Sequence, residues 1–351
     1  MLFQWVVMMR IARVVLFAVL ALGLVVSASV VFAADAPRER TGRVTVEVSV
    51  QAPAEAKDVR VWVPYPASDA SQAITDVTVN GNYLLKEVHK DPQSGSSILY
   101  VEWKGPAKER LLTYAFTATR REVLNRNLAA ADTPVPADKF KEYLDLSWLG
   151  KTEQRIRDEA ARITAGRKTN LDKARAVYAW VVDNMRRDPN AKACGLCDVE
   201  RLLAERMGKC ADVHTVFVAL CRAAGVPARD LWGIRMPKTK EGDMTKMQHC
   251  WAEFYLPGRG WLPVDAADVH KIIHDRKLSA EEARKLPERD YFFGSIEENR
   301  ILLGMAHGRL TPPQAGGPLV YFMYPYAEAD GRPMGGDINF NFGYTISFKE
   351  Q

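Results

Sequence analysis

The segment that most constrains the fold is an apolar run that directly follows a short polar motif. The motif is Gly208-Lys209-Cys210-Ala211-Asp212, and the apolar residues continue to Ala224. They fall on nearly every side of a helix with 3.6 residues per turn, so this helix has to be buried all round. Gly225-Val226-Pro227 then ends it. The feature to explain is the cysteine at the start of such a helix.

The rest of the chain divides into segments of different periodicity. Between about residues 43 and 120 apolar and polar residues alternate, as in Val44, Val46, Val48 and Val50. This pattern predicts five short strands of an antiparallel β-sandwich over residues 40–122. Residues 123–144 are polar and contain two prolines, so we interpret them as a linker.

From residue 152 the period becomes helical, and a core of mixed helices and strands is expected over residues 145–310. Two expected strands, residues 249–257 and 260–265, are joined by the turn residues Pro257–Gly260, which predicts a hairpin. Residues 311–351 alternate again and are expected to be a β extension that adds edge strands to a sheet. The predicted fold class is therefore α+β, with a β-sandwich before the core.

The first 33 residues have the composition of an export signal. Arg10 and Arg13 precede an apolar stretch from Val14, and small residues follow, which predicts a cleaved signal peptide and a periplasmic or secreted protein. Met8 or Met9 is an alternative start. An uncleaved membrane anchor is the alternative, because the apolar stretch is long enough to span a bilayer.

Charge gives little reason to expect a nucleic-acid partner. The 351 residues carry a net charge of +5, and removal of the two arginines of the signal segment, which contains no acid, leaves +3. No run of basic residues with interleaved aromatics accompanies this weak bias. We expect no nucleic-acid partner and no membrane partner beyond the signal segment. The sequence does not indicate the oligomeric state.

The cysteines allow two structural interpretations in an oxidising compartment. There are five: Cys194, Cys197, Cys210, Cys221 and Cys250. Cys194 and Cys197 are expected to form a disulfide, with each other or with Cys250. A structural zinc site is the alternative, because Cys194, Cys197, Cys210 and His214 have suitable spacing. An odd count leaves at least one free thiol if pairing stays within the chain.

A nucleophilic thiol needs conditions that Cys210 meets. A helix N-terminus lowers a thiol pKa through its unpaired backbone N–H groups. His249 opens one strand of the expected hairpin, and Asp265 closes the other. The two would lie opposite each other, which would supply an imidazole held by a carboxylate.

The same residues resemble a known family. Gly-x-Cys at a helix start, Gly-Val-Pro-Ala-Arg, His-x-Trp-x-Glu and Gly-Trp-x-x-x-Asp occur in that order between Gly208 and Asp265, and this order is similar to the transglutaminase-like superfamily of the papain-like group. The resemblance implies Cys210 as nucleophile, His249 as base and Asp265 as the residue that orients it. The sequence contains no clear acidic loop for calcium, so the calcium dependence of animal members is not carried over, and we expect no cofactor and no metal. Cys250 departs from the usual pattern, and strand parity predicts that it points away from His249.

The implied activity is acyl transfer at a peptide or amide bond through a thioester. Water as acceptor would give a protease or amidase, and an amine would give a crosslinking enzyme; we expect hydrolysis of a peptide or protein substrate. A non-catalytic binding or scaffold module with a vestigial triad is the alternative of a different class. Which of these holds, and which substrate is used, the sequence leaves open.

Several other polar residues lie close to the motif. Asp268 is the second choice for the orienting carboxylate, and Asp212 is expected to cap the first helical turn. His214 is expected to pack or to line the site. His270 is expected to be solvated, and Arg229 to form a salt bridge near its turn.

Overall fold

The computed structural model describes residues 36–126, 128–129, 135–335 and 342–351. The expected signal peptide, residues 1–33, lies outside the described residues. The chain divides into two compact units, Met1–Arg38 and Glu39–Gln351, and the second contains every described helix and strand. Among the described residues no helix combines the length and apolar character needed to cross a membrane.

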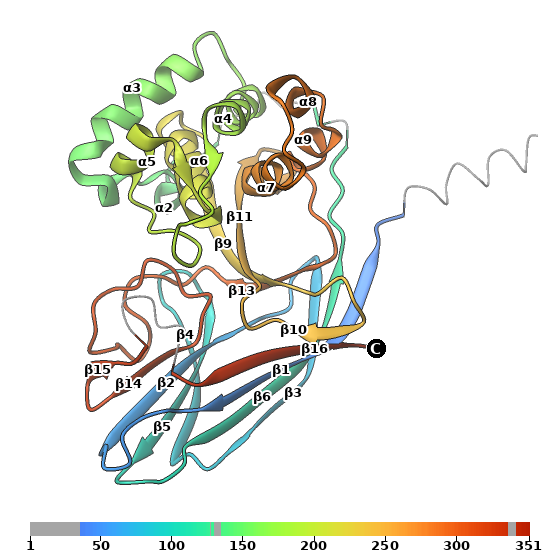
Figure 1. Cartoon of the computed structure of the whole chain (residues 1–351). Coiled ribbons are helices and arrows are strands. Elements are labelled where there is room, and N and C mark those ends of the chain that lie inside the picture. Colours follow the sequence, from blue (N-terminus) through green and yellow to red (C-terminus); the bar gives the residue numbers. More distant parts are fainter. Residues whose placement is uncertain (1–35, 127, 130–134, 336–341) are drawn as a thin grey trace, which may run out of the picture. The chain divides into compact units, whose positions relative to one another are not determined.

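Two five-stranded antiparallel sheets form the predicted β-sandwich (Figure 1). The first has the strand order β10 (Glu241–Asp243), β16 (Tyr344–Glu350), β1 (Glu39–Ser49), β6 (Leu111–Arg121), β3 (Gln72–Gly81). The second has the order β15 (Arg332–Pro333), β14 (Tyr326–Ala329), β2 (Asp58–Tyr65), β5 (Ser97–Lys104), β4 (Leu85–Lys90). Alternate valines of β1 and β2 are buried in one shared core, as the two-residue period requires.

The short segment between β3 and β4 connects the two sheets. β3 pairs with β6 in one sheet, whereas β4 pairs with β5 in the other. The region up to Arg121 therefore holds six strands, one more than expected. The tail supplies strands to both sheets, because β14 pairs with β2 and β16 pairs with β1.

The second part of the fold is a four-stranded sheet with helices packed on it. Its strand order is β12 (Gly260–Val264), β11 (Gln248–Leu256), β9 (Ala228–Arg235), β13 (Arg300–Gly304). The main helices are α3 (Glu153–Ile163), α4 (Asn170–Asn184), α5 (Val199–Glu205), α6 (Cys210–Ala223) and α7 (Ala266–Arg276). Shorter elements complete it: α2 (Lys141–Leu144), the 3-10 helix η1 (Ser147–Thr152), α8 (Ala280–Arg284), α9 (Pro287–Tyr291), β7 (Arg186–Arg187) and β8 (Met207–Gly208).

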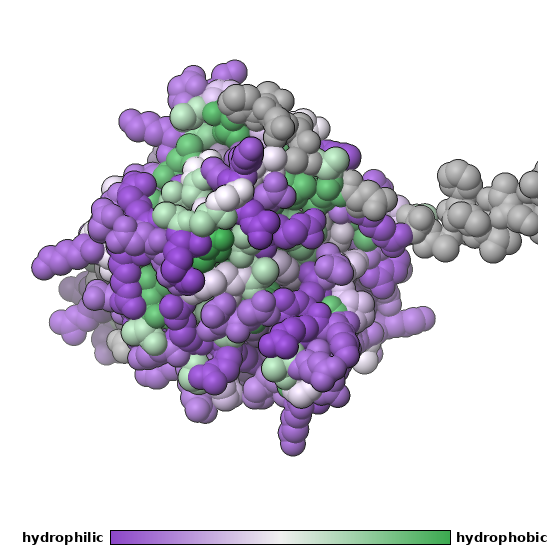
Figure 2. All heavy atoms as spheres, turned by 90° about the horizontal axis from the view of Figure 1, so that it is seen from above, coloured by the Kyte–Doolittle hydropathy of each residue, from purple (hydrophilic) through white to green (hydrophobic). Residues whose placement is uncertain are grey.

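Helix α6 occupies the centre of this part. Every residue from Cys210 to Cys221 is buried, which the apolar run predicted. The helix contacts β9 and β11 on one side and α3, α4, α5 and α7 on the others (Figure 1). On the face that Figure 2 shows, hydrophilic residues predominate and the hydrophobic areas are separate from one another. The helix is thus shielded from solvent along most of its length.

Side chains cap the starts of two helices. The Thr169 hydroxyl accepts a hydrogen bond from the backbone N–H of Asp172 at 3.1 Å. Ser279 and Glu282 form a capping box at the start of α8. These bonds satisfy N–H groups that have no partner within the helix.

Candidate active site

Cys210 is the first residue of α6, and the residues before it are built around the side chain of Asp212. One Asp212 oxygen accepts the backbone N–H of Lys209 at 3.0 Å, and the other accepts those of Leu196 and Cys197 at 2.9 Å each. A Cβ atom at Gly208 would lie 2.4 Å from the Asp212 Cβ, so only glycine fits two residues before the cysteine. Asp212 caps the first turn, as predicted, and also fixes a second loop against it.

The hairpin delivers His249 and Asp265 to the same place. Nε2 of His249 lies 2.7 Å from Oδ2 of Asp265, and both side chains are buried. Oδ1 of Asp265 accepts the backbone N–H of Asp268 at 2.8 Å, so the same carboxylate caps α7. Pairing of β11 with β12 ends at Ala252 and Val264, whereas His249 is still paired with Gly233 of β9 on the other side. Donation from Nε2 to Asp265 leaves Nδ1 available on the other side of the ring.

A buried arginine stands behind this carboxylate. Arg300, at the start of β13, is fully buried and bonds both Asp265 and Asp268. Its Nε donates to Glu297 at 2.8 Å. Burial alone would raise the pKa of Asp265, but the charges of Arg300 and His249 outweigh it and hold that pKa well below its usual range. Asp265 is therefore an anion at neutral pH.

Sequence reasoning did not identify Arg300. No part of the four-piece pattern extends to it, since it follows Asp265 by 35 residues. The available signal was its place directly before the apolar run Ile301–Leu303, because an arginine in a buried strand needs an acidic partner.

The pKa values of the Cys210 thiol and of the His249 imidazole are both shifted toward the charged forms. Contacts with the thiols of Cys194 and Cys250, and then with His249, hold the pKa of Cys210 well below its usual value despite burial. Burial and Arg235 disfavour the charged form of His249, but the carboxylate of Asp265 prevails and the pKa of His249 is raised. With both shifts, a thiolate and an imidazolium can coexist near neutral pH. Cys210 is 7% exposed, so its access is narrow.

Cys250 lies beside the candidate nucleophile. Its thiol contacts Cys210 and lies 3.6 Å from Nδ1 of His214. Helix α6 packs against β11, which brings the thiol of Cys250 to that of Cys210. His214 is buried, with Nε2 3.3 Å from Oδ1 of Asp265, so it belongs to the surroundings of the site.

The expected disulfide is not formed, since all five cysteines are free thiols. Cys194 contacts Cys210 and lies 3.3 Å from the Tyr324 hydroxyl, whereas Cys197 turns toward Thr215. The residues of the zinc alternative therefore do not converge. In the described part of the chain the grouping suited to a metal ion is His249, Asp265 and Asp268, where the Arg300 guanidinium already bonds both carboxylates.

Two further expectations have clear outcomes. Arg229 forms the expected salt bridge, with Glu253 at 2.7 Å. His270 is not solvated: it is buried, with Nε2 3.1 Å from the carbonyl oxygen of Val182. Burial lowers the pKa of His270 to about 4, because α7 turns this residue toward α4.

A thiol at the tip of a buried helix, beside an imidazole held by a carboxylate, defines the papain-like class of sites. A family model described as "Transglutaminase-like superfamily" matches residues 157–266, which include Cys210, His249 and Asp265. An "Uncharacterized protein" of Haemophilus influenzae is 35% identical over 304 residues, covering 78% of this chain and 81% of that protein. The chain belongs to the transglutaminase-like superfamily.

One solved structure shares the fold, and a second is similar over part of the chain. The "Putative Cysteine Protease from Cytophaga hutchinsonii" superposes with a TM-score of 0.53 at 16% identity, over 89% of this chain and 98% of that one. The periplasmic domain of TgpA from Pseudomonas aeruginosa gives a TM-score of 0.34 at 15% identity, over 68% of this chain and 90% of that domain. The first of these covers the β-sandwich as well as the core, so the two-part architecture is shared with it.

Proposed function

We propose that this protein is a thiol-dependent enzyme that cleaves peptide or amide bonds through a thioester on Cys210. The observation that carries the proposal is the buried contact of His249 Nε2 with Asp265 at 2.7 Å, placed beside a thiol whose pKa is lowered. A buried structural cysteine would need neither a charged partner nor a helix N-terminus.

The reaction has two steps. The Cys210 sulfur attacks the carbonyl carbon, the C–N bond breaks, and the proton that His249 holds passes to the leaving amine. Water then attacks the thioester, His249 accepts its proton, and the thiol is regenerated with release of the acid. The backbone N–H of Cys210 has no acceptor within its helix, and it can stabilise the oxyanion of each tetrahedral intermediate.

We prefer hydrolysis to crosslinking for two reasons. The solved structure from Cytophaga hutchinsonii carries the description "Putative Cysteine Protease", and its fold covers 89% of this chain. The apolar segment at residues 14–32 has the composition of an export signal, which would bring the enzyme to the periplasm or outside the cell. A cell-wall or extracellular peptide is the substrate class that this location suggests.

A covalent probe tests the thiol chemistry. A peptide vinyl sulfone should label the reduced, folded protein once, and peptide mass spectrometry should place the adduct on Cys210. Cys210→Ala should abolish labelling, whereas Cys221→Ala, which removes a buried thiol on the same helix, should leave it intact. Labelling that persists in Cys210→Ala, or no labelling of the folded protein, would favour the scaffold interpretation.

A second measurement separates water from an amine as the acceptor. A peptide amide is incubated with the enzyme in isotopically heavy water that also contains a primary amine. Hydrolysis places heavy oxygen in the acid product, whereas transfer gives the new amide. Predominant formation of the new amide would reverse our preference for hydrolysis.

A further inference from the structure

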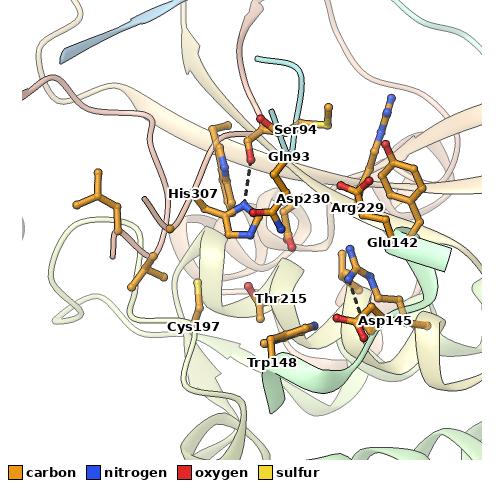
Figure 3. Close-up of a pocket in the computed structure, with 18 of the residues that line it drawn as sticks. Gln93, Ser94, Glu142, Asp145, Trp148, Cys197, Thr215, Arg229, Asp230 and His307 are labelled. Carbon is orange, nitrogen blue, oxygen red and sulfur yellow. Dashed lines mark hydrogen bonds between the residues drawn. The ribbon is translucent and has the colours of Figure 1, made fainter. Parts of the chain in front are cut away.

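A cavity of about 800 Å³ lies beside α6 and is separate from the triad residues. Thr215, Val218 and Arg222 face it at the spacing of one helical face. Figure 3 shows Asp230 and His307 on one side of the cavity and Thr215, Cys197 and Trp148 on the other. Its walls come from α2, α6, β9 and the segments around residues 93–94 and 305–320.

Two polar atoms of β9 that border this cavity have no hydrogen-bond partner among the described residues. They are Oδ1 of Asp230 and Nε1 of Trp232. Trp232 is 3% exposed and is one of the residues that line the cavity. A buried donor or acceptor without a partner costs about 1–3 kcal/mol. One unpaired acceptor and one unpaired donor two residues apart on a strand face the same space.

The arginines that line the cavity are engaged with other groups. Arg222 donates to the carbonyl oxygens of Ala228 and Asp145 at 3.0 Å each. Arg229 bonds Glu253. Neither bonds the carboxylate of Asp230. Burial raises the pKa of Asp230 to about 6, although Arg222 acts against this. At neutral pH the carboxylate is therefore largely charged, without a cation bonded to it.

The other acidic side chains at the cavity are less suited than Asp230 to bind a cation inside it. Asp145 already accepts the hydroxyl of Ser147 at 2.7 Å, and Glu142 is exposed at the rim. The remaining wall is mainly apolar, with Trp148, Val218 and Leu319 among its residues. Such a wall suits an aliphatic stem, and the carboxylate suits an ammonium group at its end.

We propose that this cavity binds a primary amine on an aliphatic stem, as in a lysine side chain, with the ammonium on Asp230 and a neighbouring carbonyl on Trp232 Nε1. The inference rests on the proposed function in one respect: it assigns the amine to the peptide substrate. Measured along α6 at 1.5 Å per residue, the residues from Thr215 to Arg222 lie about 7–18 Å from Cys210. An attacking atom must lie about 3–3.5 Å from the atom that it attacks. The amine is thus a recognition group and not the attacking nucleophile.

Binding of two matched probes to the full chain tests this proposal. Titration calorimetry on the Cys210→Ala protein, which cannot consume them, compares Nα-acetyl-lysine methylamide with Nα-acetyl-norleucine methylamide. The lysine probe should bind about tenfold more tightly or better, because it adds a charge-assisted hydrogen bond. Equal affinities, or no binding of either probe at millimolar concentration, would overturn the proposal.

Matched variants locate the effect. In the Cys210→Ala background, Asp230→Asn should remove the preference for the lysine probe, and its melting temperature shows whether it folds. Glu142→Gln, at the rim, should keep the preference. A preference that survives Asp230→Asn, or one that Glu142→Gln abolishes, contradicts the assignment. Since no step uses the thiol, failure here leaves the labelling test of Cys210 unaffected, and the reverse also holds.

Discussion

At the scale of single residues, the site is defined by charges that are buried together. Asp265 is fully buried, yet it remains an anion because Arg300 and His249 lie against it. Its charge favours the imidazolium form of His249, and the imidazolium in turn favours the thiolate of Cys210. The reactivity of the sulfur therefore depends on a carboxylate that it does not touch.

Asp265→Asn should raise the pH at which Cys210 begins to react with iodoacetamide. Loss of the carboxylate lowers the pKa of His249, the thiolate loses its cationic partner, and the pKa of the thiol rises. The check is the pH dependence of alkylation, followed by mass spectrometry at the Cys210 peptide. Asp275→Asn, at an exposed carboxylate, is the control. If alkylation of Cys210 begins at the same pH in Asp265→Asn as in the wild type, the pair of His249 and Asp265 does not lower the pKa of the thiol.

Arg300→Met should destabilise the protein strongly, because it leaves Asp265 and Asp268 buried without their common cation. Breaking a buried ion pair by removing one partner costs about 3–5 kcal/mol. Urea denaturation at neutral pH measures the loss in the free energy of unfolding. A loss below about 1 kcal/mol, the range of exposed pairs, would show that the arginine is not required there.

At the scale of elements, the start of α6 is the part of the site that the sequence pattern predicts most directly. The apolar run predicts a buried helix, and the hairpin pattern predicts where an imidazole and a carboxylate meet. Both follow from periodicity, which depends on residues that are neighbours in the chain. Arg300 and the contact of Cys250 with Cys210 depend on how separate elements pack, and one sequence does not carry that information.

Gly208→Ala tests the start of α6. Its Cβ would collide with Asp212, so the first turn must shift at a cost of about 1–3 kcal/mol, and labelling of Cys210 should slow. Gly225→Ala is the matched change at the other end of the helix. Gly225 has a φ of +80° but open space around it, so the cost should be about 1 kcal/mol with labelling unchanged. Equal labelling of both variants would show that the close approach of Gly208 to Asp212 does not position the thiol.

At the scale of the whole second unit, the β-sandwich and the core are built from interleaved segments. β16 completes a sheet that begins at β1, and β10 adds a core segment to the same sheet. The alternating tail predicted strands, but not that they would divide between two sheets, since period alone does not select a partner strand. Arg40 of β1 joins these parts.

Arg40→Ala should lower the free energy of unfolding by about 2–3 kcal/mol, because charged hydrogen bonds contribute that much when partly buried. Its guanidinium bonds Glu350 at 2.8 Å, the carbonyl of Thr239 at 2.7 Å and the side chain of Asn299 at 3.1 Å. Arg121→Ala removes an exposed pair with Glu39 and should cost less than about 1 kcal/mol. Thermal and urea denaturation compare the two variants. Similar losses in the free energy of unfolding would show that the bonds of Arg40 do not stabilise the contact between these segments.

The central claim is that Cys210 carries a thiolate stabilised by His249 in the resting protein. The most direct measurement is the ultraviolet absorbance of the thiolate, titrated with pH as the difference between the wild type and Cys210→Ser. We predict that the thiolate is already present well below the pKa of about 8.5 of an ordinary cysteine. A difference signal that rises only near that ordinary pKa would contradict the proposed active site.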